Sequence, residues 1–321
     1  MKIFFKKMMY YIVSIFILSI AVFYISRFAP GDPLISYYGE RVEKMGPQER
    51  EWAEKKLGLD APLSMQYIRW LEKAVHGDFG ISYKYKRDVK EVVAGRIGNT
   101  LLLGGMGFLL IFALALALGV WCAWQEGKPA DRIACRLGVV TGCIPEFWLA
   151  LMLILIFSVQ LKWLPSGGAY TVWQEGGLAD RIRHLILPLT VVTISHVWYY
   201  AYMVRNRMLD ELGADYVLMA RAKGLKEGHV LLKHCLRNVL PSYFSMMAIS
   251  VSHILGGTYV VEMVFSYPGL GTLAYESARY KDYNLLMLVC MLSGMLVMAG
   301  NMAAQAVNGR VDPRMRGERD G

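Results

Sequence analysis

Six apolar stretches of membrane-spanning length constrain the fold of this chain more than any other feature of its sequence. A helix needs about 20 consecutive apolar residues to cross about 30 Å of hydrocarbon. The 321 residues are 55% apolar with a mean hydropathy of +0.34, which is more apolar surface than one soluble core needs. We therefore expect an all-α polytopic membrane protein with six transmembrane helices. The expected spans are residues 8–28, 100–124, 133–161, 185–204, 240–265 and 284–307.

Two of these stretches have features of their own. The first follows Lys2, Lys6 and Lys7, as the apolar part of a secretory signal would. Because it runs for about 20 apolar residues with no small-residue cleavage site behind it, we expect a retained anchor. The third stretch is long enough to tilt or to include an end that lies at the interface.

Lysine and arginine gather in four short segments that lie on one side of the membrane if there are six spans. The segments are the N-terminus, the connection between the second and third spans, residues 205–239 and the tail 308–321. The positive-inside rule assigns this side to the cytoplasm, so we expect both termini there. The cations are Lys2, Lys6, Lys7, Lys128, Arg132, Arg136, Arg205, Arg207, Arg221, Lys223, Lys226, Lys233, Arg237, Arg310, Arg314, Arg316 and Arg319.

The long segment 29–99 lies on the opposite side in this topology. Its 12 Lys/Arg and 11 Asp/Glu nearly balance. Apolar residues recur at helical spacing in 49–59 and 65–75, and Pro47 and Pro62 stand near the starts of these stretches. We expect a small external cap with two amphipathic helices, and a structureless loop is the alternative.

The chain lacks the motifs of common catalytic and nucleotide-binding sites. Its one Gly-Lys pair, Gly127-Lys128, is followed by Pro129 and not by Ser or Thr, so it does not form an ATP-binding loop. The five cysteines include no CxxC pair, and the six histidines are dispersed in the sequence. We expect neither catalysis nor a metal site in this chain, and no nucleic acid among its partners.

Two functional classes remain. One is a translocating subunit that is energised by another protein, and the other is a secondary transporter driven by an ion gradient. A secondary transporter is expected to carry several ionisable groups at mid-membrane depth, where this sequence offers His196, His253 and Glu262. Ser250 and His253 share a helix face, so we take them with His196 as candidates for the translocation pathway. An interhelical hydrogen bond is the alternative role for His253.

The polar segment 205–239, between the fourth and fifth spans, contains a candidate docking helix. Asp215 is suited to cap its start and Gly224 to end it, whereas Tyr216, Met219 and Ala220 share one face. We expect this helix to project from the bundle and to contribute little to its packing. A solvated amphipathic loop helix is the alternative. The docking residues are Asp215, Tyr216, Met219, Ala220, Arg221, Ala222, Lys223 and Gly224.

Nine motifs follow one another along nearly the whole chain. They are APGDP (29–33), LGLDAPLSMQYIRWL (57–71), GDFGIS (77–82), RIGNTL (96–101), FWLA (147–150), DYVLMARAKGL (215–225), LRNVLP (236–241), GGTYVVEMVFSYPGLG (256–271) and VDPR (311–314). In kind and order they resemble the ABC importer permeases of the dipeptide/oligopeptide/nickel transport family. The general importer signature begins Glu-Ala-Ala where this chain has Leu218-Met219-Ala220, and the distance from Gly224 to Pro241 is longer. Both departures resemble the peptide/nickel branch.

The resemblance implies a type I ABC importer permease fold in a bacterial inner membrane. Such a permease works with a second homologous permease, two cytoplasmic ATPases and an extracytoplasmic substrate-binding protein. ATP and Mg would be bound by the ATPases, and this chain would hold no cofactor. It would form half of the pathway for peptides or for nickel, free or chelated, with the ion-driven transporter as the alternative.

The same resemblance assigns roles to segments. The helix of residues 216–224 would seat in an ATPase cleft as a coupling helix, with Arg221 and Lys223 adding charge pairs at its rim. Glu262, Pro268 and Gly269 would close a periplasmic turn. The expected segments are an N-terminal span (1–28), an external loop (29–99), a five-helix core (100–307) that includes the coupling loop 205–239, and a cytoplasmic tail (308–321).

Overall fold

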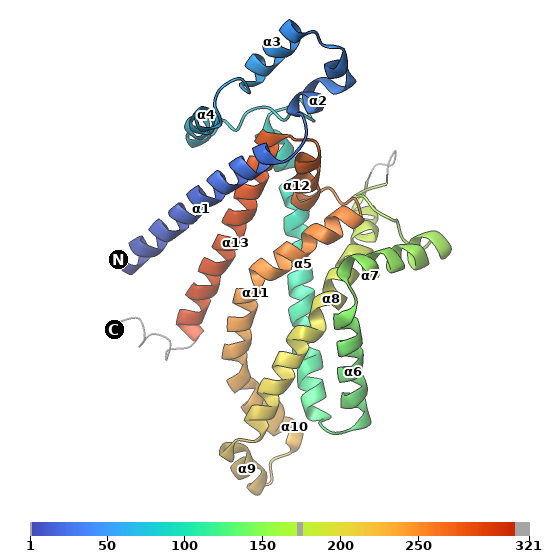
Figure 1. Cartoon of the computed structure of the whole chain (residues 1–321). Coiled ribbons are helices and arrows are strands. Elements are labelled where there is room, and N and C mark those ends of the chain that lie inside the picture. The colour runs from blue at the N-terminus through green and yellow to red at the C-terminus, as the bar shows by residue number, and fades with distance from the viewer. Residues whose placement is uncertain (1, 172–175, 312–321) are drawn as a thin grey trace. The chain divides into compact units, whose positions relative to one another are not determined.

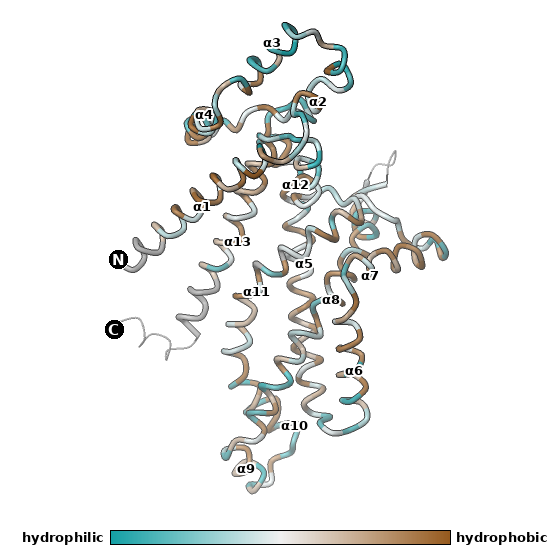
Figure 2. The backbone as a smooth tube through the Cα atoms, in the orientation of Figure 1, coloured by the Kyte–Doolittle hydropathy of each residue, from teal (hydrophilic) through white to brown (hydrophobic). Residues whose placement is uncertain are grey.

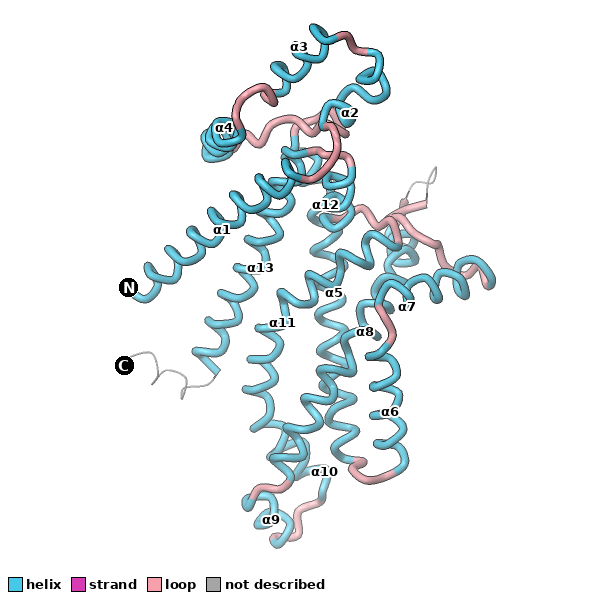
Figure 3. The backbone as a smooth tube through the Cα atoms, viewed as in Figure 1, coloured by secondary structure: helices cyan, strands magenta, loops and turns pink. Residues whose placement is uncertain are grey.

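The computed structural model describes residues 2–171 and 176–311, and the regular structure in this part of the chain is helical (Figure 3). One isolated antiparallel bridge joins Ile81 and Asp88. The backbone divides into two compact units, of which unit 1 comprises Met1–Thr100 and Pro268–Met298, and unit 2 comprises Leu101–Tyr267 and Ala299–Gly321. The tail beyond residue 311, with the end of the VDPR motif, lies outside the described residues.

Four helices of the described chain are long and apolar enough to cross a membrane (Figure 1). They are α1 (Lys2–Phe28), α5 (Val89–Trp124), α8 (Leu178–Leu212) and α13 (Tyr283–Val311). Two bent helix pairs also qualify, so the number of spans rises to six if each bent pair counts as one. The expected polytopic α-helical fold is therefore confirmed.

The third expected span is a broken helix and not a single tilted one. Helix α6 (Pro129–Cys143) ends shortly before α7 (Glu146–Leu153) begins, and the axes of the two parts differ by 99°. Pro145 stands between them, which disfavours a helical conformation at the preceding residue and removes a backbone donor. Figure 2 shows that both parts are largely hydrophobic, so the length and hydropathy of the stretch gave no sign of the break.

The fifth expected span is bent as well. Its principal helix, α11 (Leu236–Val264), follows a π-helical turn, η3 (Val230–Cys235), and the short α10 (Glu227–His229). The axis changes direction by 54° within α11. A second π-helical stretch, η2 (Ile154–Gln160), continues α7. Such turns insert an extra residue into the helical ladder and often accompany functional sites.

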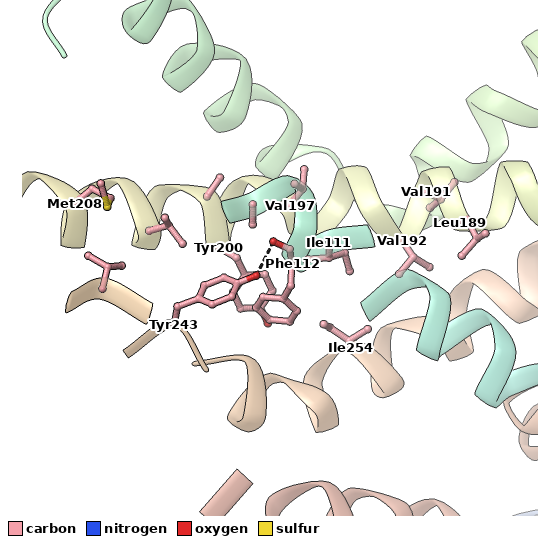
Figure 4. Close-up of a cluster of buried hydrophobic side chains, with 14 of the residues drawn as sticks. Ile111, Phe112, Leu189, Val191, Val192, Val197, Tyr200, Met208, Tyr243 and Ile254 are labelled. Atoms are coloured by element: carbon pink, nitrogen blue, oxygen red, sulfur yellow. Dashed lines mark hydrogen bonds between the residues drawn. The ribbon is translucent and has the colours of Figure 1, made fainter. Parts of the chain in front are cut away.

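The core of unit 2 is built from aromatic and aliphatic side chains of α5, α8 and α11 (Figure 4). The rings of Phe112 and Tyr200 lie 4.7 Å apart between centroids. Tyr243 donates a hydrogen bond of 2.7 Å from its hydroxyl to the carbonyl oxygen of Phe112. This bond satisfies a buried phenol within an apolar cluster, so it fixes the position of α11 against α5 without leaving a buried polar group unpaired.

Unit 1 contains the segment expected outside the membrane, and this segment is helical. Its helices α3 (Pro47–Leu57) and α4 (Leu63–Val75) confirm the two amphipathic helices of the sequence analysis. Pro47 is the first residue of α3, as expected for a first-turn proline, whereas Pro62 precedes α4 at the cap position. The segment also contains two helices that were not expected from its sequence, α2 (Pro33–Tyr38) and the 3-10 helix η1 (Gly39–Lys44).

Polar side chains tie this segment to the rest of unit 1. Asp282, which directly precedes α13, is fully buried and accepts hydrogen bonds from the hydroxyl of Ser82 and from the backbone N–H of Lys84. The Nζ atom of Lys84 lies 3.0 Å from Oε2 of Glu276 on α12 (Leu270–Arg279). Tyr85 donates a hydrogen bond to the same carboxylate. The loop between α4 and α5 is thus fixed to residues about 200 positions away.

Candidate functional site

The candidate docking helix exists as α9 (Asp215–Ala222). Gly224 has φ of +78°, a left-handed conformation that glycine adopts without strain and that ends a helix as expected. The expected capping role of Asp215 is wrong, because Ala214 occupies the cap position and Asp215 is the first helical residue. Its carboxylate still lies in the first turn, where the helix dipole favours negative charge.

The expected common face of Tyr216, Met219 and Ala220 is wrong. Ala220 is only 8% exposed and packs with the fully buried Val217 in the core of unit 2, whereas Met219 is 61% exposed. Successive residues of a helix are 100° apart, so neighbours such as Met219 and Ala220 can face opposite environments. The inward side of α9 contributes to packing, contrary to expectation. The exposed residues are Asp215, Leu218, Met219, Arg221, Ala222, Lys223 and Gly224.

A second contact holds α9 to its neighbouring helices. The hydroxyl of Tyr216 lies 2.5 Å from Oε2 of Glu211, near the end of α8, and the same oxygen accepts a hydrogen bond of 3.2 Å from Asn238 of α11. Burial and the bond to Glu211 raise the pKa of Tyr216, so its hydroxyl keeps its proton and donates. Tyr216 thus joins α9 to the end of α8, and Glu211 joins α8 to α11.

The three candidate pathway residues lie together. His196 of α8 and Ser250 and His253 of α11 all line one cavity of about 760 Å³ in unit 2. The rings of His196 and His253 are 5.2 Å apart between centroids. Ser250 donates from its hydroxyl to the carbonyl oxygen of Met246 at 2.7 Å. His196 and His253, which are distant in sequence, thus form a pair in the fold. Their role in transport stays a prediction.

Arg205, which also lines the cavity, belongs to a buried ion pair with Asp131. Nε of Arg205 lies 2.8 Å from Oδ1 of Asp131, and its Nη2 lies 2.6 Å from Oδ2. The two side chains are 15% and 5% exposed. This bidentate geometry provides each ion with two hydrogen bonds. Arg205, expected from sequence only as one of the cytoplasmic cations, therefore has a specific partner.

Sequence reasoning missed Glu146, the first residue of α7. Its Oε1 atom is buried and has no hydrogen-bond partner in the protein. The signal was present, because an ionisable side chain inside an apolar membrane stretch is a functional candidate. Among the described residues, no group of three His, Cys, Asp or Glu side chains has the geometry of a metal site.

The residues expected to close a periplasmic turn adopt a turn. Glu262 is fully buried, and its carbonyl oxygen accepts a hydrogen bond of 2.8 Å from the backbone N–H of Tyr267. Gly269 caps the start of α12, and the carbonyl oxygen of Pro268 accepts a hydrogen bond of 2.8 Å from the amide of Asn99. Their assignment to the periplasmic side stays a prediction.

Two family models match the chain. The model of the binding-protein-dependent transport system inner membrane component matches residues 115–317, and the model of its N-terminal region matches residues 1–104. The oligopeptide transport system permease protein AppB of Bacillus subtilis is 36% identical over 299 residues, which cover 93% of this chain and 94% of the relative. A putative peptide permease protein of Brucella ovis is 33% identical over 300 residues, with the same shares covered.

The fold also matches a solved structure. An inward-facing form of the MetNI methionine ABC transporter contains a chain that superposes with a TM-score of 0.57 and 19% sequence identity. The match covers 70% of the present chain and 97% of the other. At this identity the likeness concerns the fold, and it supports the type I importer architecture expected from the sequence.

Proposed function

This chain belongs to the inner membrane components of binding-protein-dependent ABC importers, and we propose that it is a peptide permease driven by ATP that partner subunits hydrolyse. The observation that carries the proposal is the position of α9, whose outer residues are exposed while Tyr216 on its inner side is hydrogen-bonded to Glu211 of α8, which in turn accepts a hydrogen bond from Asn238 of α11. The names of the relatives refer to oligopeptides and peptides, which favours a peptide over nickel.

The proposed assembly contains a second homologous permease, two cytoplasmic ATPases and an extracytoplasmic binding protein. ATP and Mg bind to the ATPases, since this sequence has no phosphate-binding loop. The present chain supplies half of the translocation pathway. Both termini and α9 face the cytoplasm, and the segment with α2, α3 and α4 faces the periplasm, in keeping with the distribution of Lys and Arg.

The proposed coupling proceeds through α9. Its outer residues Leu218 and Met219, each 61% exposed, seat in a cleft of one ATPase. When ATP binding closes the ATPases, α9 moves with them. Because Tyr216 is bonded to Glu211 of α8, and Val217 packs in the core, the motion is transmitted to the helices that line the cavity. The cavity then changes its access from one side of the membrane to the other.

A double variant tests the docking surface. Leu218→Asp with Met219→Asp places two charges where apolar side chains are expected to be buried by the ATPase. Burying one such side chain contributes about 1.5–3 kcal/mol, so ATPase association should weaken by about tenfold or more. Copurification of the ATPases, peptide-stimulated ATP hydrolysis and uptake should all fall. The abundance of the permease in the membrane should not change, because both positions are exposed.

Trp52→Asp is the matched control. Trp52 is 59% exposed on α3, in the segment proposed to lie outside the cell, so this variant should retain its ATPases. Normal copurification and uptake in the double variant would reject the docking role of α9. Uptake that persists after deletion of the ATPases but stops with a protonophore would instead favour an ion-driven secondary transporter.

A further inference from the structure

Three ionisable side chains from three helices converge within unit 2. Glu146 belongs to α7, His196 to α8 and His253 to α11, and all three helices belong to candidate membrane spans. Gly257 of α11 makes the approach possible. A Cβ atom at this position would lie 3.0 Å from Cε1 and 3.2 Å from Nε2 of His196, and 3.8 Å from Oε2 of Glu146. The imidazole and the carboxylate therefore share the space that the glycine leaves open.

The imidazole of His196 presents an acceptor at this place. Its Nδ1 atom lies 2.9 Å from the carbonyl oxygen of Val192, and a carbonyl can only accept, so Nδ1 carries the proton. In the neutral ring the lone pair is then on Nε2, the nitrogen beside Gly257. The backbone contact thus fixes which nitrogen faces the shared space.

The carboxylate of Glu146 adds acceptors without a matching cation. Its Oε1 atom is buried without a hydrogen-bond partner in the protein. Glu146 is the first residue of α7, where the backbone N–H groups of the helix terminus favour the negative charge. Burying an unpartnered polar group is costly, so such a group indicates an interaction that is completed by another molecule.

The cavity next to this cluster has no competing free cation among its described lining residues. Arg205 is the one Lys or Arg that lines it, and both of its contacting nitrogens are held by Asp131. His196 and His253 lie in the cavity wall, and His253 is exposed to the cavity. At the histidine pair, the nearby acceptors are therefore available to a donor that enters the cavity.

We propose that Glu146, His196 and His253 form a recognition site for the protonated amino group of the transported peptide. An ammonium group is compact, carries three N–H donors and one positive charge, and matches a carboxylate together with imidazole lone pairs. A peptide carboxylate would instead meet the like charge of Glu146 and the lone pair on Nε2 of His196. The site rests on the proposed function, because it assigns a chemical role to residues beside the cavity through which the peptide passes.

The test compares two peptides that differ in that amino group. Trialanine and N-acetyl-trialanine are titrated into the complete importer in nanodiscs, without the binding protein, and the two dissociation constants are measured by calorimetry. The wild type should bind trialanine about tenfold or more tightly than its acetylated form, since a hydrogen bond to a charged group is the stronger kind. Glu146→Gln should remove this preference by weakening trialanine alone.

Two glycine variants provide a matched pair. Gly257→Ala displaces the imidazole of His196 and should weaken trialanine binding in the same way. Gly256→Ala, where a Cβ atom would meet nothing within 4 Å, should leave both dissociation constants unchanged. His253→Gln serves as a second probe of the cluster that does not depend on Glu146, because its side chain is exposed to the cavity.

Several results would overturn the amine site. These are a wild type that binds both peptides equally or binds neither, a preference that survives in both Glu146→Gln and His253→Gln, and radioactive Ni²⁺ binding that Glu146→Gln abolishes. In each case ATP-dependent uptake of trialanine by the wild type would remain. Failure of the proposed function would instead appear as uptake that does not require the ATPases.

Discussion

Different kinds of contact stabilise the interiors of the two compact units of this chain. Unit 2 relies on close packing of apolar helices, in which Gly119 on α5 lies against Val204 and Ala201 of α8. Unit 1 contains two apolar clusters and, in addition, polar contacts between distant segments, such as those of Asp282 with Ser82 and Lys84. The difference follows the surroundings expected for the two sets of contacts. Hydrocarbon offers no partner for an open hydrogen bond, whereas the segment between α4 and α5 lies outside the candidate spans and can be fixed by polar side chains.

The ion pair of Asp131 and Arg205 is a polar contact within the apolar core of unit 2. Breaking it should have the largest effect on the free energy of unfolding. Arg205→Met leaves Asp131 buried without its partner, which should lower the free energy of unfolding by about 3–5 kcal/mol. The midpoint of thermal unfolding of the purified permease measures this loss. The double variant Asp131→Asn with Arg205→Met should recover most of it. Equal losses in the single and double variants would mean that packing, and not the unpaired charge, determines the effect.

Disturbing the close packing of α5 and α8 in unit 2 should have the second-largest effect on the free energy of unfolding. In Gly119→Ala, the added Cβ atom would lie 2.6 Å from Cβ of Val204 and 2.7 Å from the carbonyl oxygen of Ala201, so α5 and α8 must separate. Overpacking of this kind should cost about 1–3 kcal/mol. Gly105→Ala, on the same helix with nothing within 4 Å, is the control and should cost nothing measurable. Unchanged unfolding midpoints in both variants would contradict close packing between α5 and α8.

The polar contacts of Glu276 in unit 1 should make the smallest contribution to stability, and this contribution should depend on pH. Burial raises the pKa of Glu276, but hydrogen bonds from Tyr85 and Lys84 outweigh it and hold the pKa below the ordinary value of a glutamate. A lowered carboxylate pKa stabilises the fold above the ordinary glutamate value, and this stabilisation is lost as pH falls through the folded-state pKa. The loss should be less than about 1 kcal/mol, because the pair is partly exposed.

Proteolysis within residues 76–88 at decreasing pH measures this local stability. Glu276→Gln should remove the dependence on pH, because its side chain does not titrate, while the spans remain intact. A profile in this variant that is identical to that of the wild type would assign the effect to another group.

The features that sequence predicted best depend on local patterns. The apolar stretches located the spans, and helical spacing located α3 and α4, because both follow from the length and period of one segment. The order of nine motifs indicated the family that two family models match. The turn residue Gly224 was also identified correctly, since its left-handed backbone is a local property.

The wrong predictions concern residues whose surroundings depend on contacts between segments. The helical period of α9 predicted that Ala220 and Met219 share one face. Contacts with the neighbouring η3 and α8 instead bury Ala220 and leave Met219 exposed. The break before Glu146 is not visible in the hydropathy because both halves of the span are apolar, and Pro145 between them is its local signal.

By itself, the sequence determined the positions of the apolar stretches, two of the helices in the segment 29–99 and the family. These depend on composition and spacing along the chain, where each apolar run must cross the same hydrocarbon thickness. Only the tertiary structure decided that Glu146 meets His196 beside Gly257, and that Arg205 pairs with Asp131 at a distance of 74 residues in sequence. Such encounters depend on which helix faces touch, and side-chain packing between helices selects those faces.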